Sequence, residues 1–84
     1  MKHYVYIVEC SDGSFYTGYT LNIKNRLWQH NFGKQGAKSI KGKLPVELVH
    51  SEEYKTKSQA LKREMEIKSW PRERKLKLVM SLKT

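Results

Sequence analysis

A carboxylate stands on the apolar stripe of a predicted helix in the second half of the chain. Glu64 lies three residues after Leu61 and three before Ile67, so a helix places its side chain on or beside the inward face. Burying a bare carboxylate is costly, so Glu64 must be paired, hydrogen-bonded or bound to a cation. Lys68, one helical turn later, and Arg26 are the pairing partners that the sequence offers. A structural ion pair and a functional site both fit this position.

Arg26 and His30 form a second group of chemical interest. They are four residues apart in a predicted helix and border Ile23 and Leu27, so both polar heads point to the same edge of its apolar stripe. An arginine and a histidine placed in this way suit the binding of a phosphate group. Taken singly, Arg26 also fits an ordinary solvated arginine, and His30 a capping or surface residue.

Two runs of β-branched and aromatic residues, 4–8 and 15–20, predict a β-hairpin around a short polar turn. They carry Tyr6 and Tyr16, and strand tyrosines are most often core residues with a hydrogen-bonded hydroxyl. Gly18 is more informative, because a glycine weakens a strand unless another group approaches its backbone closely.

The register of this hairpin decides whether its tyrosines can act together. A two-residue turn at Asp12-Gly13 would place the two tyrosines on opposite faces of the sheet. A three-residue loop, with Gly13 in the left-handed region as a bulge, would pair Tyr6 with Gly18. That register puts Tyr6 and Tyr16 on the same face. The residues alone leave both registers open.

Capping residues divide the rest of the chain into further elements. Asn22 is a suitable N-cap, Gly33 and Gly36 end the helix that follows it, and Thr56 or Ser58 lies at the cap of a later helix. We expect one domain, residues 1–84, because a chain of this length holds a single small core. The order is β-β-α-β-α-α, an α+β class. After the hairpin, the predicted elements are a helix from residue 22 to about 33, a strand at 46–50, a helix at 58–70 and a basic helix at 72–80.

Charge is the strongest signal in the composition. The chain has 17 lysine and arginine residues against 8 acidic ones, a formal net charge of +9. Residues 34–84 carry +8 of it, most of it in an expected mobile loop from Lys34 to Lys43 and in the final helix. Such a field attracts polyanions, above all nucleic acid, although a basic surface that is merely solvated is the alternative. The residues that we expect to contact nucleic acid are Gly18, Lys34, Lys38, Lys41, Lys43, Lys68, Arg72 and Arg74.

Other features exclude whole classes of protein. The longest apolar stretches, 4–8 and 78–80, are far shorter than the roughly 20 residues of a membrane-spanning helix. The first residues do not form a secretory signal, so we expect a cytoplasmic protein. Cys10 is the only cysteine, so no intramolecular disulfide can form, and we expect it to be a buried small side chain.

The residues singled out above fall into an ordered pattern of short motifs. The motifs are Tyr4-Val5-Tyr6, Tyr16-Thr17-Gly18, Arg26 with His30, and Ala60-Leu61-Lys62-Arg63-Glu64. The sequence resembles a GIY-YIG domain of the small stand-alone kind, over nearly the whole chain from about residue 2 to 78.

This resemblance implies a three-stranded antiparallel sheet flanked by helices, with both tyrosines on one face and therefore the three-residue hairpin loop. It implies that Glu64 binds a divalent metal ion, Mg²⁺ or Mn²⁺, and that Arg26 steadies the phosphate. Tyr6 and Tyr16 would orient or activate the attacking water, and His30 would assist proton transfer or hold a tyrosine.

The function that follows from the resemblance is a metal-dependent endonuclease. We expect it to hydrolyse phosphodiester bonds in DNA rather than RNA, to be structure-selective or weakly sequence-specific, and to act in repair or recombination. The chain leaves room for a protein partner that supplies specificity. The alternative is a non-catalytic module that binds DNA or RNA on the same scaffold.

Overall fold

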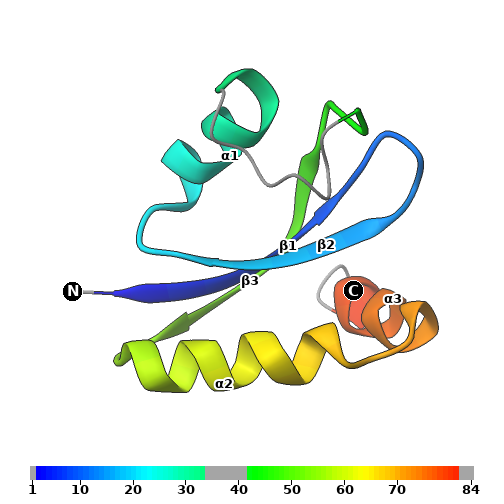
Figure 1. Ribbon diagram of the computed structural model, residues 1–84. Coiled ribbons are helices and arrows are strands. Elements are labelled where there is room, and N and C mark those ends of the chain that lie inside the picture. The colour runs from blue at the N-terminus through cyan, green and yellow to red at the C-terminus, as the bar shows by residue number, and fades with distance from the viewer. Residues whose placement is uncertain (1, 34–41, 82–84) are drawn as a thin grey trace.

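The computed structural model describes residues 2–33 and 42–81 and shows an α+β fold in the predicted order. Three antiparallel strands form one sheet in the order β2-β1-β3, and helices lie on both of its faces (Figure 1). The elements are β1 (His3–Glu9), β2 (Phe15–Thr20), α1 (Ile23–Phe32), β3 (Glu47–Tyr54), α2 (Lys57–Lys68) and α3 (Arg72–Ser81). No helix in the described part of the chain is long and apolar enough to cross a membrane.

The hairpin between β1 and β2 adopts the three-residue loop. Tyr6 pairs with Gly18 and Val8 with Tyr16, so the two tyrosines share a face of the sheet. Gly13 has a φ of +85°, the left-handed conformation that this loop requires of its last residue. The backbone N–H of Gly13 donates to the carbonyl of Cys10, which closes the turn.

The third strand is longer than the sequence predicted. We expected residues 46–50, whereas β3 runs from Glu47 to Tyr54 and pairs with β1 along its whole length. Val49 is an extra residue opposite the Ile7–Val8 step, and this bulge explains why the strand alternates imperfectly. The polar end of the strand was missed because Glu52 is stabilised by side chains distant in sequence.

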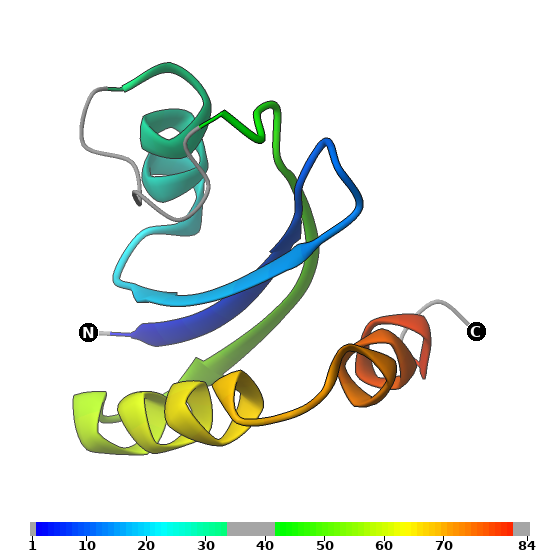
Figure 2. The same cartoon turned by 45° about the vertical axis from the view of Figure 1, so that its right-hand side comes forward.

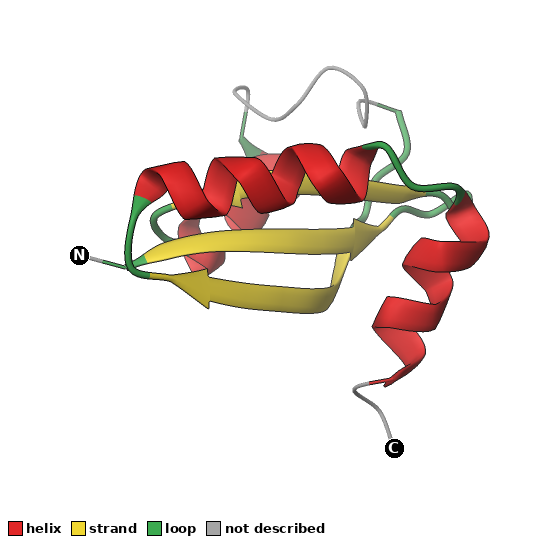
Figure 3. Cartoon of the chain, turned by 90° about the horizontal axis from the view of Figure 1, so that it is seen from below, coloured by secondary structure: helices red, strands yellow, loops and turns green. Residues whose placement is uncertain are grey.

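Each face of the sheet has its own apolar cluster. On one face, β1 packs against α2 and α3, and the buried residues of this cluster are Val5, Ile7, Ala60, Ile67 and Val79. On the other face, Leu27 of α1 packs against Tyr6, Val8, Cys10 and Val46. Helix α2 runs along the strands, and α3 turns away from it at one end of the sheet (Figure 3). The chain therefore sets α1 and α2 on opposite sides of the same strands, as Figure 2 also shows.

An asparagine fastens the end of α1 to the segment that leads into β3. The Oδ1 atom of Asn31 accepts from the backbone N–H of Val46 at 2.7 Å, and its Nδ2 donates to the Val46 carbonyl at 3.2 Å. The side-chain amide thus satisfies both backbone groups of a buried residue, as a neighbouring strand would.

We expect the substitution Asn31→Ala to lower the free energy of unfolding by about 1 to 3 kcal/mol, because it leaves two buried backbone groups without partners. Urea denaturation measures the change. The substitution Asn25→Ala, at an exposed position of the same helix, is the matched control. Equal stabilities of the two variants would show that this contact does not hold α1 in place.

Candidate active site

Tyr6 and His30 form the buried centre of the site between the sheet and α1. Their side chains are almost fully buried, with residue exposures of 1% and 2%. The hydroxyl of Tyr6 lies 2.8 Å from Nε2 of His30. His30 is therefore neither a capping nor a surface residue, which were its alternatives in the sequence.

Gly18 makes room for the ring of Tyr6. A Cβ atom built on Gly18 would lie 2.4 Å from the hydroxyl oxygen and 2.6 Å from Cζ of Tyr6. The group that approaches this strand glycine closely is thus the chain's own tyrosine. The glycine is buried and Tyr6 fills the space above it, so its place in the strand is explained without a bound molecule. The contact of Gly18 with nucleic acid stays a prediction.

Tyr16 completes an aromatic cluster on the same face. Its ring centroid lies 6.4 Å from that of Tyr6 and 5.6 Å from the His30 ring, which it meets edge to face. Tyr16 is only half-buried. Of the two tyrosines, it is therefore the more accessible to solvent or a bound molecule.

The surroundings set the protonation states of the buried pair. Burial raises the pKa of Tyr6 to about 12, although Arg26 acts in the opposite direction, and the charges of Tyr16 and, least of all, Glu64 add to the increase. Burial, and then the Arg26 charge, lower the pKa of His30 to about 4. At neutral pH, Tyr6 therefore keeps its proton and His30 is uncharged, so the hydroxyl can donate to Nε2.

Glu64 and Arg26 come from helices on opposite faces, yet both act electrostatically on the Tyr6 hydroxyl. The side chain of Glu64 is 15% exposed, and Nζ of Lys68 lies 3.4 Å from its Oε2. Lys68, one of the two partners that the sequence offered for Glu64, is thus in contact with it. Arg26 is half-buried and donates to Oε1 of Gln29 at 3.1 Å. The sequence motifs thus converge around one hydroxyl group.

The donor set around Glu64 restricts how a metal ion could be held. In the described residues, no group of three or more His, Cys, Asp or Glu side chains could hold one. A protein-built cage is therefore absent from that part of the chain. A single carboxylate does suit Mg²⁺, which keeps several waters and is often bound through one or two carboxylates plus substrate phosphates.

The basic residues predicted to bind nucleic acid lie in different surroundings. Lys34, Lys38 and Lys41 fall outside the described residues. Lys43 lies 3.6 Å from the Asp12 carboxylate, beside the hairpin loop. Lys68 lies next to Glu64 and therefore at the site itself.

The arginines of the final helix lie over aromatic rings. The guanidinium of Arg74 is 4.1 Å from the centroid of Trp70, and that of Arg63 is 5.0 Å from the same ring. Trp70 is half-buried, and both guanidinium groups lie against its ring. Arg72 lies over Phe15 at 4.9 Å.

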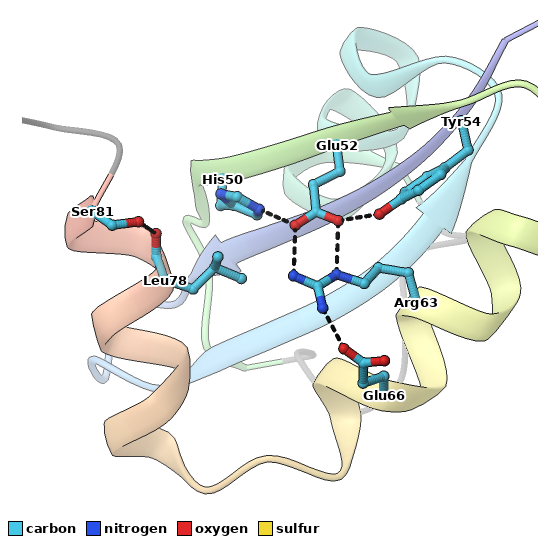
Figure 4. Close-up of polar contacts among 7 residues, drawn as sticks. All are labelled: His50, Glu52, Tyr54, Arg63, Glu66, Leu78 and Ser81. Carbon is cyan, nitrogen blue, oxygen red and sulfur yellow. Dashed lines mark hydrogen bonds and ion pairs between the residues drawn. The ribbon is translucent and has the colours of Figure 1, made fainter.

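A polar cluster that sequence reasoning missed holds α2 on β3 (Figure 4). Glu52 accepts from Nε of Arg63 at 2.9 Å and from Nη2 at 3.2 Å, and it also contacts His50 and Tyr54. Burial alone would raise the pKa of Glu52, but hydrogen bonds from these three side chains outweigh it and lower the pKa to about 2. Because Arg63 directly precedes Glu64, this cluster fixes the turn of α2 that carries the site carboxylate. The alternate spacing of residues 50, 52 and 54 was the signal for a continued strand.

The lowered pKa of His30 predicts an acid-sensitive fold. Because protonation is disfavoured in the folded state, the stabilisation is complete above the ordinary value of 6.5 and is lost as the pH falls toward 4. The pKa of Glu52 is also lowered, but Glu52 makes stability depend on pH only below its ordinary pKa of 4.5. Between pH 7 and pH 5, we expect His30 to account for a loss of about 2 kcal/mol in the free energy of unfolding.

The measurement for His30 is chemical denaturation of the wild type and of the variant His30→Gln at both pH values. Glutamine cannot titrate but can still accept from the Tyr6 hydroxyl. The variant should lose the pH dependence assigned to His30, whereas the same change at the half-buried His3 should keep it. A full pH slope in His30→Gln would refute the assignment.

These elements and side chains have the arrangement of a GIY-YIG domain, as the sequence motifs suggested. The family model described as the GIY-YIG catalytic domain matches residues 2–77. The chain therefore belongs to the GIY-YIG family, a family of nuclease type.

The chain is similar to the UPF0213 proteins, which are small proteins of GIY-YIG type. It is 58% identical over 78 residues to UPF0213 protein SSP2268 of Staphylococcus saprophyticus, covering 93% of this chain and 94% of that protein. Among solved structures, it is similar to the solution structure of the UPF0213 protein BH0048 from Bacillus halodurans, with a TM-score of 0.62, 42% identity and coverage of 95% and 84%. For EF2693 from E. faecalis, the TM-score is 0.66, the identity is 36% and the coverage is 98% and 86%. These names specify no activity.

Proposed function

We propose that this protein is a metal-dependent endonuclease that hydrolyses phosphodiester bonds in DNA. The observation that carries the proposal is the buried Tyr6–His30 hydrogen bond, in a site where Arg26 and Glu64 act on the same hydroxyl from opposite faces of the sheet. Strongly shifted pKa values such as those of Tyr6 and His30 cluster at functional sites, which supports a catalytic role for this pair.

The protonation states favour a proton relay over a phenolate base. Tyr6, with a pKa of about 12, is not ionised at neutral pH and is a poor base by itself. It can orient the attacking water and pass its own proton to the neutral Nε2 of His30 while taking one from the water. Tyr16, at the exposed edge of the cluster, would help to orient the same water.

Arg26 and Glu64 would provide the electrostatic part of catalysis. The Arg26 guanidinium can bind non-bridging phosphate oxygens and neutralise the charge that develops on them. Glu64 would hold one divalent ion, which supplies charge neutralisation and assists the leaving oxygen. Lys68 would release Glu64 on binding of the ion and turn to the substrate phosphates.

Recognition would rest on charge and shape. Contacts from lysine and arginine to phosphate carry little sequence information, so we propose a structure-selective or weakly sequence-specific enzyme. A role in DNA repair or recombination, in the cytoplasm, fits such an activity. A protein partner would then supply any further specificity.

A second candidate function is a nucleic-acid-binding module without turnover. The observation that favours it is the contact between Lys68 and Glu64, which satisfies the carboxylate without any metal ion. The +9 charge would serve such a module equally well.

The test incubates the protein with end-labelled duplex, single-stranded, flap and junction DNA and a structured RNA, with Mg²⁺, Mn²⁺ or EDTA. Cleavage of DNA that EDTA abolishes would support the nuclease and show its preferred substrate. Salt-sensitive binding with no cleavage of any substrate would refute it in favour of the module.

A further inference from the structure

A cavity lies between the tip of the β1–β2 hairpin and α3, apart from the Tyr6–His30 centre. It has a volume of about 200 Å³. Its lining is Ser14 and Phe15 from the hairpin and Arg72 and Lys75 from α3. Two cations thus face a small cavity with an aromatic wall.

Arg72 is held in place at this cavity. Its guanidinium lies 4.9 Å from the centroid of the Phe15 ring, and its Nη1 donates to the carbonyl of Gly13. A guanidinium has five N–H donors, so most of them are left for a ligand. Because the side chain is already ordered by the protein, binding would cost little additional conformational entropy.

The charge at the cavity is positive. Lys75 is half-buried, and within residues 2–33 and 42–81 neither Lys75 nor Arg72 forms an ion pair with a carboxylate. The sheet register places Glu9 opposite Phe15, and the acidic residue closest in sequence to Ser14 and Phe15 is Asp12. It accepts hydrogen bonds from Ser14 and is paired with Lys43. An arginine fork beside a lysine is a favourable arrangement for a phosphate group.

The cavity and the candidate active site lie along the same open edge of the sheet. β2 is an outer strand, with α1 on one face and α2 and α3 on the other (Figure 2). Phe15 lines the cavity on the face that α2 and α3 cover, and the next residue, Tyr16, belongs to the aromatic cluster around Tyr6 on the opposite face. A phosphodiester chain that crosses this edge could reach both places.

We propose that Arg72 and Lys75 bind a backbone phosphate of the nucleic-acid substrate on the α3 side of the β2 edge, at a distance from the scissile one, in the cavity that Phe15 also lines. The inference rests on the proposed function and deepens it, because it assigns a substrate-positioning subsite to α3. It adds Lys75 and Phe15 to the interface and gives Arg72 a defined role in it.

The experiment measures binding of a short fluorescent DNA duplex as a function of salt, in the Glu64→Gln background so that no cleavage interferes. Arg72→Ala and Lys75→Gln are compared with Lys77→Gln, an exposed lysine on the same helix. Arg72→Ala and Lys75→Gln should each weaken binding several-fold and lower the slope of log K against log[salt] by about 1. The control should change both quantities less.

Thermal unfolding checks that each variant is folded, and Lys75→Gln keeps the test valid if Arg72→Ala is unstable. Duplex binding by folded Arg72→Ala and Lys75→Gln that matches Lys77→Gln would overturn the proposal. A titration with inorganic phosphate distinguishes a site for a free phosphate ion from a site for a phosphate of the DNA backbone. If Lys75→Gln impairs phosphate binding but leaves duplex binding unchanged, the cavity binds a free anion and the proposal is wrong.

The subsite and the proposed function can fail separately. Cleavage by the wild type, together with unchanged duplex binding in both cavity variants, would contradict the subsite alone. Weakened binding in the cavity variants, with no cleavage by the wild type, would support a phosphate contact at α3 and contradict the nuclease.

Discussion

The variant Glu64→Gln should lose DNA cleavage by at least about 100-fold while it still binds DNA. Glutamine keeps the shape of the side chain but removes the negative charge needed to hold a divalent ion. It also frees Lys68, 3.4 Å away, to contact phosphate, so affinity should stay level or rise. Cleavage is followed on end-labelled substrates with Mg²⁺ in excess, and binding is followed without metal.

The matched control for this variant is Glu66→Gln. Glu66 lies on the same helix and pairs with Arg63, but its side chain is 55% exposed, and its charge acts on Tyr54. Its loss should cost little activity, because exposed ion pairs contribute about 0 to 1 kcal/mol. Near wild-type cleavage by Glu64→Gln, or an equal loss in Glu66→Gln, would contradict the assignment of Glu64 as the metal ligand.

The variant Gly18→Ala should lose both stability and activity. The added methyl group would lie 2.4 Å from the Tyr6 hydroxyl, and Tyr6 is almost fully buried, so its ring has no free space to enter. Forcing a methyl group into such a core costs about 1 to 3 kcal/mol in the free energy of unfolding. Relief of the clash would shift the hydroxyl away from Nε2 of His30, and we expect cleavage to fall by at least about 10-fold.

Urea denaturation and cleavage assays on the same preparations measure these two effects. A double-mutant cycle with Tyr6→Leu identifies their cause. If the clash is with the ring, Gly18→Ala should cost much less stability in the Tyr6→Leu background than in the wild type. An equal cost in both backgrounds would show that glycine is needed for backbone reasons instead.

Local interactions explain what could be predicted from the sequence. The side chains of Asn22 and Thr56 accept from backbone N–H groups three residues later, so each helix start is determined within one turn. Asn22 was predicted as a cap, and Thr56 was one of two candidates for the other. The ordered motifs around the two tyrosines, Arg26 and Glu64 likewise indicated the family before the fold was known.

The hairpin register depended on more than the turn. Asp12-Gly13 suits both a two-residue turn and the bulged three-residue loop, so local preference did not choose between them. The three-residue loop lets Tyr6 pack over Gly18 and reach His30, and these groups come from three separate elements. The turn sequence left the register open, and the register that the protein adopts is the one that buries Tyr6.

Contacts between residues far apart in sequence are what only the tertiary structure decided. The end of β3 was missed although its residues alternate, because Glu52 is neutralised by Arg63, eleven residues later and on another element. Arg72 lies over the ring of Phe15, 57 residues earlier in the chain. Neither hydrophobic periodicity nor a capping residue predicts such a contact. Sequence by itself determined the elements and the chemical groups, since these depend on neighbours along the chain. Their distances, burial and protonation states depend on packing across the sheet, and only the fold established them.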